Sequence, residues 1–224
     1  MERKPINVII TGATGMVGEG VLHVCLSHPD IQSVLIINRK SLGLQHPKLT
    51  EIVHPSLLDI SSLAPRLSGY QACFFCLGIS SVGISAEDYY QTTYTLTMHV
   101  ASVLSGLNRE MCFCYISGAH TDSSEHGRIR WARVKGKTEN DLAKLPFLRV
   151  YGFRPGFIKP IPGLAHVHKY YKYIGWFFPI GRAISPGGFC TLPELALALI
   201  NIVFEKPPNH NVEGTEIIRL AINK

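Results

Sequence analysis

The chain has 224 residues, of which 46% are hydrophobic and 17% are charged, with 20 glycines and 14 prolines. These values exclude a disordered chain, a collagen, a coiled coil and a disulfide scaffold, and they are typical of one domain with additions. The 22 lysines and arginines exceed the 16 aspartates and glutamates, which gives a formal net charge of +6. The cations are spread along the chain, a pattern that favours anionic ligands in general and does not single out nucleic acid.

Strand-like and helix-like segments alternate along the chain. The predicted strands are Ile6–Ile10, Val34–Ile37, Glu51–Val53, Ala72–Leu77, Met111–Ile116, Leu148–Phe153 and Glu216–Ala221. The predicted helices are Met16–Ser27, Ala86–Leu107, Ile129–Leu145 and Leu192–Phe204. Continuous apolar strands separated by helices predict an α/β fold, a doubly wound parallel sheet of about seven strands. We expect a single domain over residues 1–224, in which residues 160–190 form an insertion on the substrate side.

The first strand runs into the sequence TGATGMVG, residues 11–18. In this strand–turn–helix context Gly12 permits the sharp turn, Gly15 lets the backbone approach a pyrophosphate, and Gly18 brings the helix close to the sheet. The helix N-terminus offers free N–H groups and the positive end of its dipole. We therefore predict a dinucleotide pyrophosphate held by Gly12, Thr14, Gly15, Met16 and Val17. The alternative is a tight turn without a ligand.

The second strand ends in Asn38-Arg39-Lys40. A site that prefers NAD usually has an acidic residue here for the ribose 2′-hydroxyl, whereas two cations suit a 2′-phosphate. The sequence therefore predicts NADP(H) rather than NAD, with a solvated basic loop as the alternative. Asp59, after the third strand, is placed either to accept from the adenine amino group or to cap a helix over Ile60–Leu67.

Five motifs in order resemble the short-chain dehydrogenase/reductase (SDR) superfamily, in an atypical form. They are TGATGMVG at 11–18, Cys76-Leu77-Gly78 after the fourth strand, Ser117 after the fifth, Lys135 on the following helix, and Arg154-Pro155-Gly156-Phe157-Ile158 after the sixth. Within the superfamily, the chain is most similar to Tat-interacting-protein-like reductases and to bacterial epimerase/dehydratase-like proteins. The resemblance extends over nearly the whole chain.

The resemblance implies an NADP(H)-binding Rossmann-like protein, an oxidoreductase or epimerase that acts on a small carbonyl or alcohol. It implies that Lys135 anchors the nicotinamide ribose and that Ser117 orients the substrate. It also implies cofactor contacts at Leu77 and Gly78 beside the ribose, and at Pro155, Gly156, Phe157 and Ile158 beside the nicotinamide.

One position departs from the superfamily pattern. Trp131 stands four residues before Lys135, where the superfamily has a tyrosine that transfers the proton. An indole N–H donates hydrogen bonds but has no useful acidity near neutral pH. His120, on the loop after Ser117, and Tyr94, on the long helix, are candidate replacements. Two alternatives are a reaction that needs only weak acid assistance from water, and no turnover at all, with NADP(H) binding serving a regulatory or redox-sensor role.

The remaining signals concern compartment and partners. Six cysteines suit a reducing compartment, and we expect them to be structural, with no metal site. The N-terminus lacks a signal-peptide pattern and no apolar run reaches the roughly 20 residues of a spanning helix, so we expect a cytoplasmic protein. Residues 128–137 carry five cations, interpreted as a solvated helix face rather than a nucleic-acid site. Residues 166–178 mix cations with aromatics and suggest a lid or a homodimer contact rather than a membrane anchor.

Overall fold

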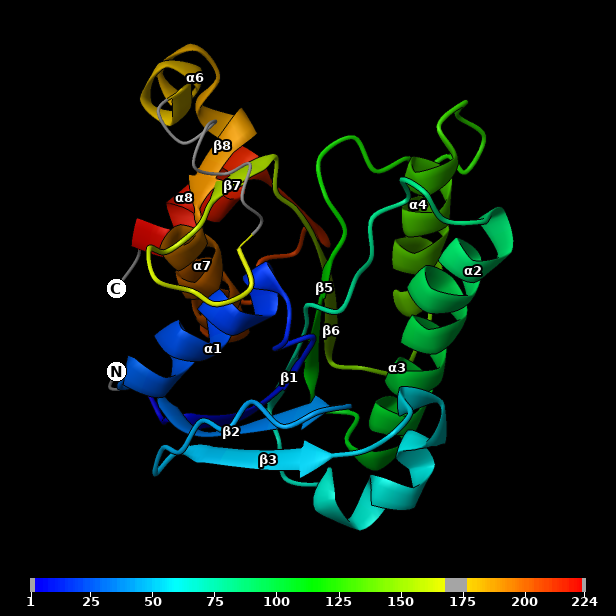
Figure 1. Ribbon diagram of the computed structural model, residues 1–224, viewed down its shortest axis with the longest axis vertical. Coiled ribbons are helices and arrows are strands. Elements are labelled where there is room, and N and C mark those ends of the chain that lie inside the picture. The colour runs from blue at the N-terminus through cyan, green and yellow to red at the C-terminus, as the bar shows by residue number, and fades with distance from the viewer. Residues whose placement is uncertain (1–2, 168–176, 223–224) are drawn as a thin grey trace.

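The computed structural model describes residues 3–167 and 177–222. Its centre is a parallel sheet of seven strands in the order β3-β2-β1-β4-β5-β6-β9 (Figure 1). These strands are β1 (Ile6–Thr11), β2 (Ile31–Asn38), β3 (Leu49–Val53), β4 (Ala72–Phe75), β5 (Cys112–Ile116), β6 (Arg149–Arg154) and β9 (Asn211–Glu213). The α/β prediction with about seven parallel strands is confirmed.

Helices cover both faces of the sheet, which explains why its central strands are apolar on both sides. The helical elements are α1 (Met16–Ser27), η1 (Leu57–Arg66), α2 (Ala86–Tyr90), η2 (Gln91–Thr95), α3 (Leu96–Leu107), α4 (Arg130–Leu142), α6 (Phe178–Ile184), η4 (Pro186–Gly188), α7 (Leu192–Glu205) and α8 (Gly214–Ile222). Buried residues of α1, α7 and α8 form one core cluster with the sheet, and residues of η1, α3 and α4 contribute to a second. Figure 1 shows these two groups on opposite sides of the strands.

The C-terminal prediction is wrong in one respect. The segment Glu216–Ala221, predicted as a strand, belongs to α8, and the seventh strand is the three-residue β9 before it. Ile217 and Leu220 are both buried, and their spacing of three places them on one helical face. Asn201 of α7 donates from its side chain to the carbonyl of Leu220 at 2.7 Å, which joins the two helices.

A second, two-stranded parallel sheet lies at the two ends of the predicted insertion 160–190. Its strands are β7 (Phe157–Lys159) and β8 (Phe189–Thr191), and α6 lies between them along the chain. Aromatic contacts join Phe157, Phe178 and Phe189, with ring centroids 5.7 to 6.3 Å apart. Most of the aromatic and basic run 166–178, the predicted lid or homodimer contact, lies outside the described residues.

The glycine at the start of α1 is required by close packing. A Cβ at Gly18 would lie 2.2 Å from the carbonyl oxygen of Gly12 and 2.9 Å from the amide nitrogen of Ala13. We therefore expect Gly18→Ala to lower the free energy of unfolding by about 1–3 kcal/mol, because the helix must move away from the turn. Urea unfolding measures this, and Gly106→Ala is the matched control, since a Cβ at this helical glycine meets nothing within 4 Å. Equal stability of the two variants would contradict the close approach.

Candidate functional site

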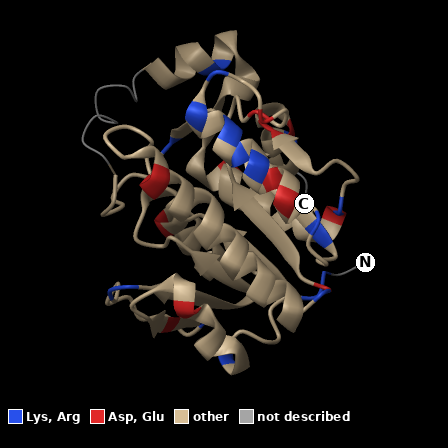
Figure 2. Cartoon of the chain, turned by 90° about the vertical axis from the view of Figure 1, so that its right-hand side faces the viewer, with Lys and Arg blue, Asp and Glu red and all other residues tan. Residues whose placement is uncertain are grey.

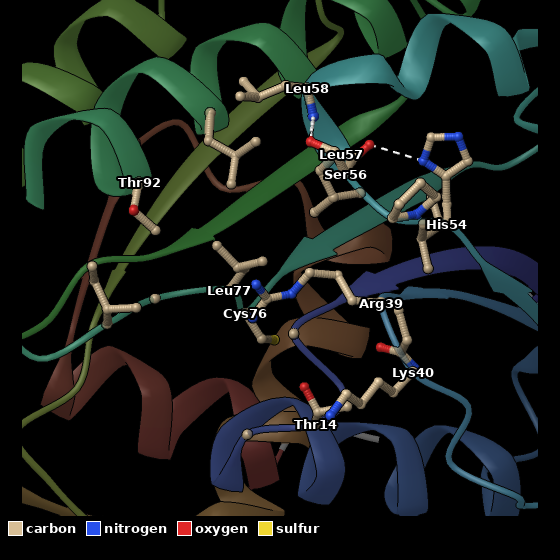
Figure 3. A pocket seen from close by; sticks show the side chains of 18 of the residues that line it. Thr14, Arg39, Lys40, His54, Ser56, Leu57, Leu58, Cys76, Leu77 and Thr92 are labelled. Atoms are coloured by element: carbon tan, nitrogen blue, oxygen red, sulfur yellow. Dashed lines mark hydrogen bonds between the residues drawn. The ribbon is translucent and has the colours of Figure 1, made fainter. Parts of the chain in front are cut away.

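A cavity of about 1070 Å³ lies at the carboxyl ends of β1, β2, β3 and β4 (Figure 3). Strand order reverses between β1 and β4, and ligands of such sheets bind outside the carboxyl ends of the strands at that point. The cavity brings together eight of the predicted site residues: Gly12, Thr14, Gly15, Asn38, Arg39, Lys40, Leu77 and Gly78. They come from three separate segments, after β1, β2 and β4, that only the parallel sheet places side by side.

The turn after β1 presents bare backbone to this cavity. Gly12 has a φ of 73°, and a Cβ there would lie 2.7 Å from the amide nitrogen of Leu77. Gly15 is the N-cap residue of α1 and has no side chain to cap the first helical amides. Those amides and the helix dipole suit an anion, because both present positive charge at the helix N-terminus. Met16 and Val17 lie in the first turn and pack against the core instead of lining the cavity.

Two cations enter the cavity from the end of β2. Arg39 and Lys40 are exposed, and none of the ion pairs found between described residues includes either of them. The nearby carboxylate of Glu51 accepts from Asn38 Nδ2 at 2.9 Å, Ser41 Oγ at 2.6 Å and Leu42 N at 3.0 Å. Burial raises the pKa of Glu51, but these three hydrogen bonds outweigh it and the pKa lies below its usual value. The carboxylate therefore holds the loop that carries the two cations through its hydrogen bonds.

The predicted catalytic serine faces the protein interior. Ser117 is 3% exposed, and its hydroxyl lies 2.5 Å from Glu139 Oε1 and 2.9 Å from the carbonyl of Phe153. Arg154 holds the same carboxylate through Nε and Nη2, and its Nη1 reaches Glu213 at 3.1 Å. Ser117 therefore belongs to a buried hydrogen-bonded ion pair and does not line the cavity.

Lys135 is the titratable group next to this ion pair. Its Nζ donates to the carbonyl of Ser117, and burial lowers its pKa to about 8, although the carboxylate of Glu139 acts in the opposite direction. Trp131 stands one helical turn before it, half-buried. His120, on the loop after β5, is exposed and has a left-handed backbone with a φ of 64°.

Tyr94 is engaged elsewhere. Its hydroxyl donates to Asp141 of α4 at 2.8 Å, and the same carboxylate receives Lys137 at 2.7 Å and Lys144 at 2.6 Å. On the face of the molecule shown in Figure 2, lysines and arginines are interspersed with acidic residues. Tyr94 thus joins η2 to α4 and does not line the cavity.

The other predicted residues, Asp59 and the turn after β6, do not line the cavity. Asp59 is exposed in the first turn of η1, 3.9 Å from His54 Nε2, and the helix is capped by Ser56, whose hydroxyl accepts from Leu58 N at 3.1 Å. The turn Pro155, Gly156, Phe157 and Ile158 continues from β6 into β7. The carbonyl of Pro155 accepts from Ala119 N at 2.8 Å, so this turn lies against the loop after β5.

Sequence reasoning missed more than half of the cavity wall. The missed residues are Ile37, Ser41, Leu42, His54, Pro55, Ser56, Leu57, Leu58, Cys76, Ile79, Gln91, Thr92, Leu96 and His166. The segment His54–Leu58 follows β3 as Arg39 follows β2, so the rule about carboxyl ends of strands was a usable signal. Within the described residues no three His, Cys, Asp or Glu side chains are grouped to hold a metal ion, and no helix is long and apolar enough to cross a membrane.

The chain is similar in sequence to known proteins. The NAD dependent epimerase/dehydratase family matches residues 8–129. The protein fmp52-1 of Aspergillus oryzae is 29% identical over 159 residues, which are 68% of this chain and 66% of the relative. Rat HTATIP2 is 26% identical over 157 residues, which are 68% of this chain and 62% of the relative. The chain thus spans slightly less than two thirds of the length of these relatives.

Solved structures share the fold at low identity. UDP-glucose 4-epimerase of Thermotoga maritima, with UDP-glucose, superposes with a TM-score of 0.66 at 13% identity, covering 96% of this chain and 81% of its own. A short chain dehydrogenase of Burkholderia cenocepacia in complex with NADP gives a TM-score of 0.64 at 13% identity. The match covers 94% of this chain and 88% of the dehydrogenase chain. The expected resemblance to SDR-type Rossmann proteins is confirmed.

The prediction of a cytoplasmic protein is wrong, as the names of the sequence relatives show. The relatives from Aspergillus oryzae and Saccharomyces cerevisiae, the latter 27% identical over 154 residues, are both named as mitochondrial proteins. A cytoplasmic location therefore does not follow from the absence of a signal-peptide pattern and of a long apolar run.

Proposed function

The chain belongs to the NAD dependent epimerase/dehydratase family, and we propose that it binds NADP(H) in the cavity described above and acts as an oxidoreductase or epimerase on a small carbonyl or alcohol. The observation that carries this proposal is the end of β2. Two cations line the cavity there, and the carboxylate of Glu51 is occupied by Asn38, Ser41 and Leu42, which flank them in the sequence. This arrangement suits a 2′-phosphate, and the described residues that line the cavity include no Asp or Glu for a 2′-hydroxyl.

The residues present fit such a cofactor. A Cβ at Gly12 would meet the backbone after β4, and Gly15 leaves the helix amides uncapped, so the turn can accept a diphosphate at close range. Leu77 and Gly78 then lie along the ribose, and Arg39 with Lys40 binds the 2′-phosphate. When bound, the nicotinamide supplies the hydride or accepts it. The volume of about 1070 Å³ suits a ligand of dinucleotide size.

On the substrate side we place Lys135 and His120. The ammonium of Lys135 points toward the end of β5, where it is suited to hold a ribose hydroxyl. Trp131 cannot transfer a proton and the hydroxyl of Tyr94 is bound to Asp141, so the exposed imidazole of His120 is our candidate proton donor.

A second function is favoured by two observations. Trp131 replaces the proton donor of the superfamily, and the hydroxyl of Ser117 is directed to the buried Glu139. Both suit a non-catalytic NADP(H)-binding protein with a regulatory or redox-sensor role. In that case binding of the dinucleotide persists without turnover.

Oxidation of NADPH across a panel of small carbonyls separates these functions. We expect turnover by the wild type, a loss of about 100-fold in Lys135→Met, and a gain of about 10- to 100-fold in Trp131→Tyr, because a positioned general acid contributes about 10²–10⁴ to a rate. NADPH binding with no oxidation of any substrate, in the wild type and in Trp131→Tyr, would favour the regulatory function. Failure to bind NADPH would overturn both.

The loop that carries the cations supplies a further prediction. Glu51→Ala removes three hydrogen bonds from this loop, so we expect NADPH to bind about tenfold more weakly, as the loop must be ordered on binding. Titration calorimetry measures this change. Thr50→Ala, an exposed neighbour on the same strand, serves as the control and should bind NADPH normally. An unchanged affinity in Glu51→Ala would show that the loop needs no such support.

A further inference from the structure

A buried carboxylate lies in α1, directly after the glycine turn. Glu19 is 8% exposed and accepts from the amide nitrogens of Ala165 at 2.8 Å and His166 at 2.9 Å. Its Oε2 also lies 2.9 Å from Nδ1 of the His166 ring. Burial raises the pKa of Glu19, but the hydrogen bonds from Ala165 and His166 outweigh it and the pKa lies below its usual value. The carboxylate is therefore ionised at neutral pH.

An ionised carboxylate in the first turn of a phosphate-binding helix opposes anion binding unless its charge is balanced. The segment around His166 supplies this balance from 146 residues further along the chain. An ionised carboxylate only accepts hydrogen bonds, so the ring nitrogen in contact with it, Nδ1, carries a hydrogen. The contact fixes the ring and leaves Nε2 as its second polar atom.

The ring of His166 shares the cavity wall with Gly12, Thr14 and Gly15, the residues of the glycine turn. We propose that His166 is a ligand of the dinucleotide diphosphate and that Glu19 is its positioning residue. This inference rests on the proposed function. With Nδ1–H donated to Glu19, Nε2 can donate to a phosphate oxygen only when the ring is an imidazolium, so the complex requires the protonated ring.

Some charges around the His166 ring favour its imidazolium form and others oppose it. Glu19 of α1 and the diphosphate itself favour the imidazolium. Arg39 and Lys40, which line the same cavity at the end of β2, oppose it, and His54 and Cys76 are the other titratable side chains of the wall. The imidazolium bridges two anions, the carboxylate and the diphosphate.

The test compares NADPH binding to wild type, His166→Gln and Glu19→Gln by titration calorimetry. We expect His166→Gln to weaken NADPH binding about tenfold near pH 6, because one charge-assisted hydrogen bond is lost. Adenosine 2′-monophosphate lacks the diphosphate, so it should bind wild type and His166→Gln equally. His23→Gln is the matched control, since His23 is exposed on α1, the helix that holds Glu19, and does not line the cavity.

The pH dependence of NADPH binding distinguishes a phosphate ligand from a residue with a merely structural role, because a structural role would leave this dependence unchanged. Between about pH 6 and about pH 8 the affinity of wild type for NADPH should fall more steeply than that of His166→Gln, and Glu19→Gln should show the shallow dependence of His166→Gln. Thermal unfolding checks that both variants are folded. Equal NADPH affinity and equal pH dependence in wild type and His166→Gln would overturn the inference alone. A wild type that binds neither NADPH nor adenosine 2′-monophosphate would overturn the proposed function and the inference with it.

Discussion

Replacing Glu139 with alanine is expected to lower the free energy of unfolding by about 3–5 kcal/mol, because it removes one partner of a buried ion pair. Arg154 is 9% exposed, and its Nε and Nη2 both contact this carboxylate. Without it, a buried guanidinium keeps, among the described residues, the half-exposed Glu213 alone as its acidic partner, and the hydroxyl of Ser117 loses a bond of 2.5 Å. Urea or thermal unfolding measures the change.

Two further variants separate charge from packing. Glu139→Gln keeps the shape of the side chain, so it should recover part of the stability while the charge stays absent. Glu216→Ala breaks a pair with Arg219 that lies on the protein surface, and surface pairs contribute about 0–1 kcal/mol. If Glu139→Ala were no less stable than Glu216→Ala, the buried ion pair would contribute nothing that holds β6 to α4.

The second large effect concerns cofactor choice. Arg39→Ala combined with Lys40→Ala is expected to weaken NADPH binding about 100-fold, because each charge-assisted contact to a 2′-phosphate contributes about 1.5 kcal/mol and 1.4 kcal/mol is a factor of ten. NADH has no 2′-phosphate, so its affinity should change less than about threefold. Titration of both nucleotides against both proteins measures the two ratios.

The control for this pair is Arg109→Ala, which removes an exposed cation just before β5. Arg109 lies at the amino ends of the strands, whereas the cavity lies at their carboxyl ends. This variant should leave both affinities unchanged. Added salt should weaken NADPH binding more than NADH binding in the wild type, since it screens exposed charges. Equal losses for the two nucleotides in the double variant would mean that these cations contact something other than the 2′-phosphate.

The sheet was predictable because its central strands are almost wholly apolar. Ile9 and Phe74 are fully buried between two layers of helices, and continuous apolar runs are typical of parallel strands covered on both faces. The C-terminal error has the opposite cause. A short apolar run such as Glu216–Ala221 suits a strand and a helix equally well by composition. The contact of Asn201 with Leu220, which favours the helix, comes from a distant part of the chain.

Some features of the site were likewise predictable from the sequence, and others were not. Gly12 and Arg39 were predictable because each follows a strand directly, and the carboxyl ends of parallel strands meet at one edge. Gly15 was predictable from its spacing after Gly12 at the start of a helix. The direction of the Ser117 hydroxyl was not predictable, since it depends on Glu139. In sequence, Glu139 stands in a highly charged helix and has the pattern of a solvated residue. Its burial follows from the packing of α4 against β6, where a Cβ at Gly152 would lie 2.5 Å from its carboxylate.

Titration of the purified wild-type protein with NADPH and with NADH tests the central claim, that the cavity after β1 and β2 binds a dinucleotide through its diphosphate and 2′-phosphate. The account predicts saturable binding of one NADPH per chain, at least about tenfold tighter than NADH, as expected for at least one charge-assisted contact to the extra phosphate. Absence of any heat change or change in nicotinamide fluorescence with either nucleotide would contradict it.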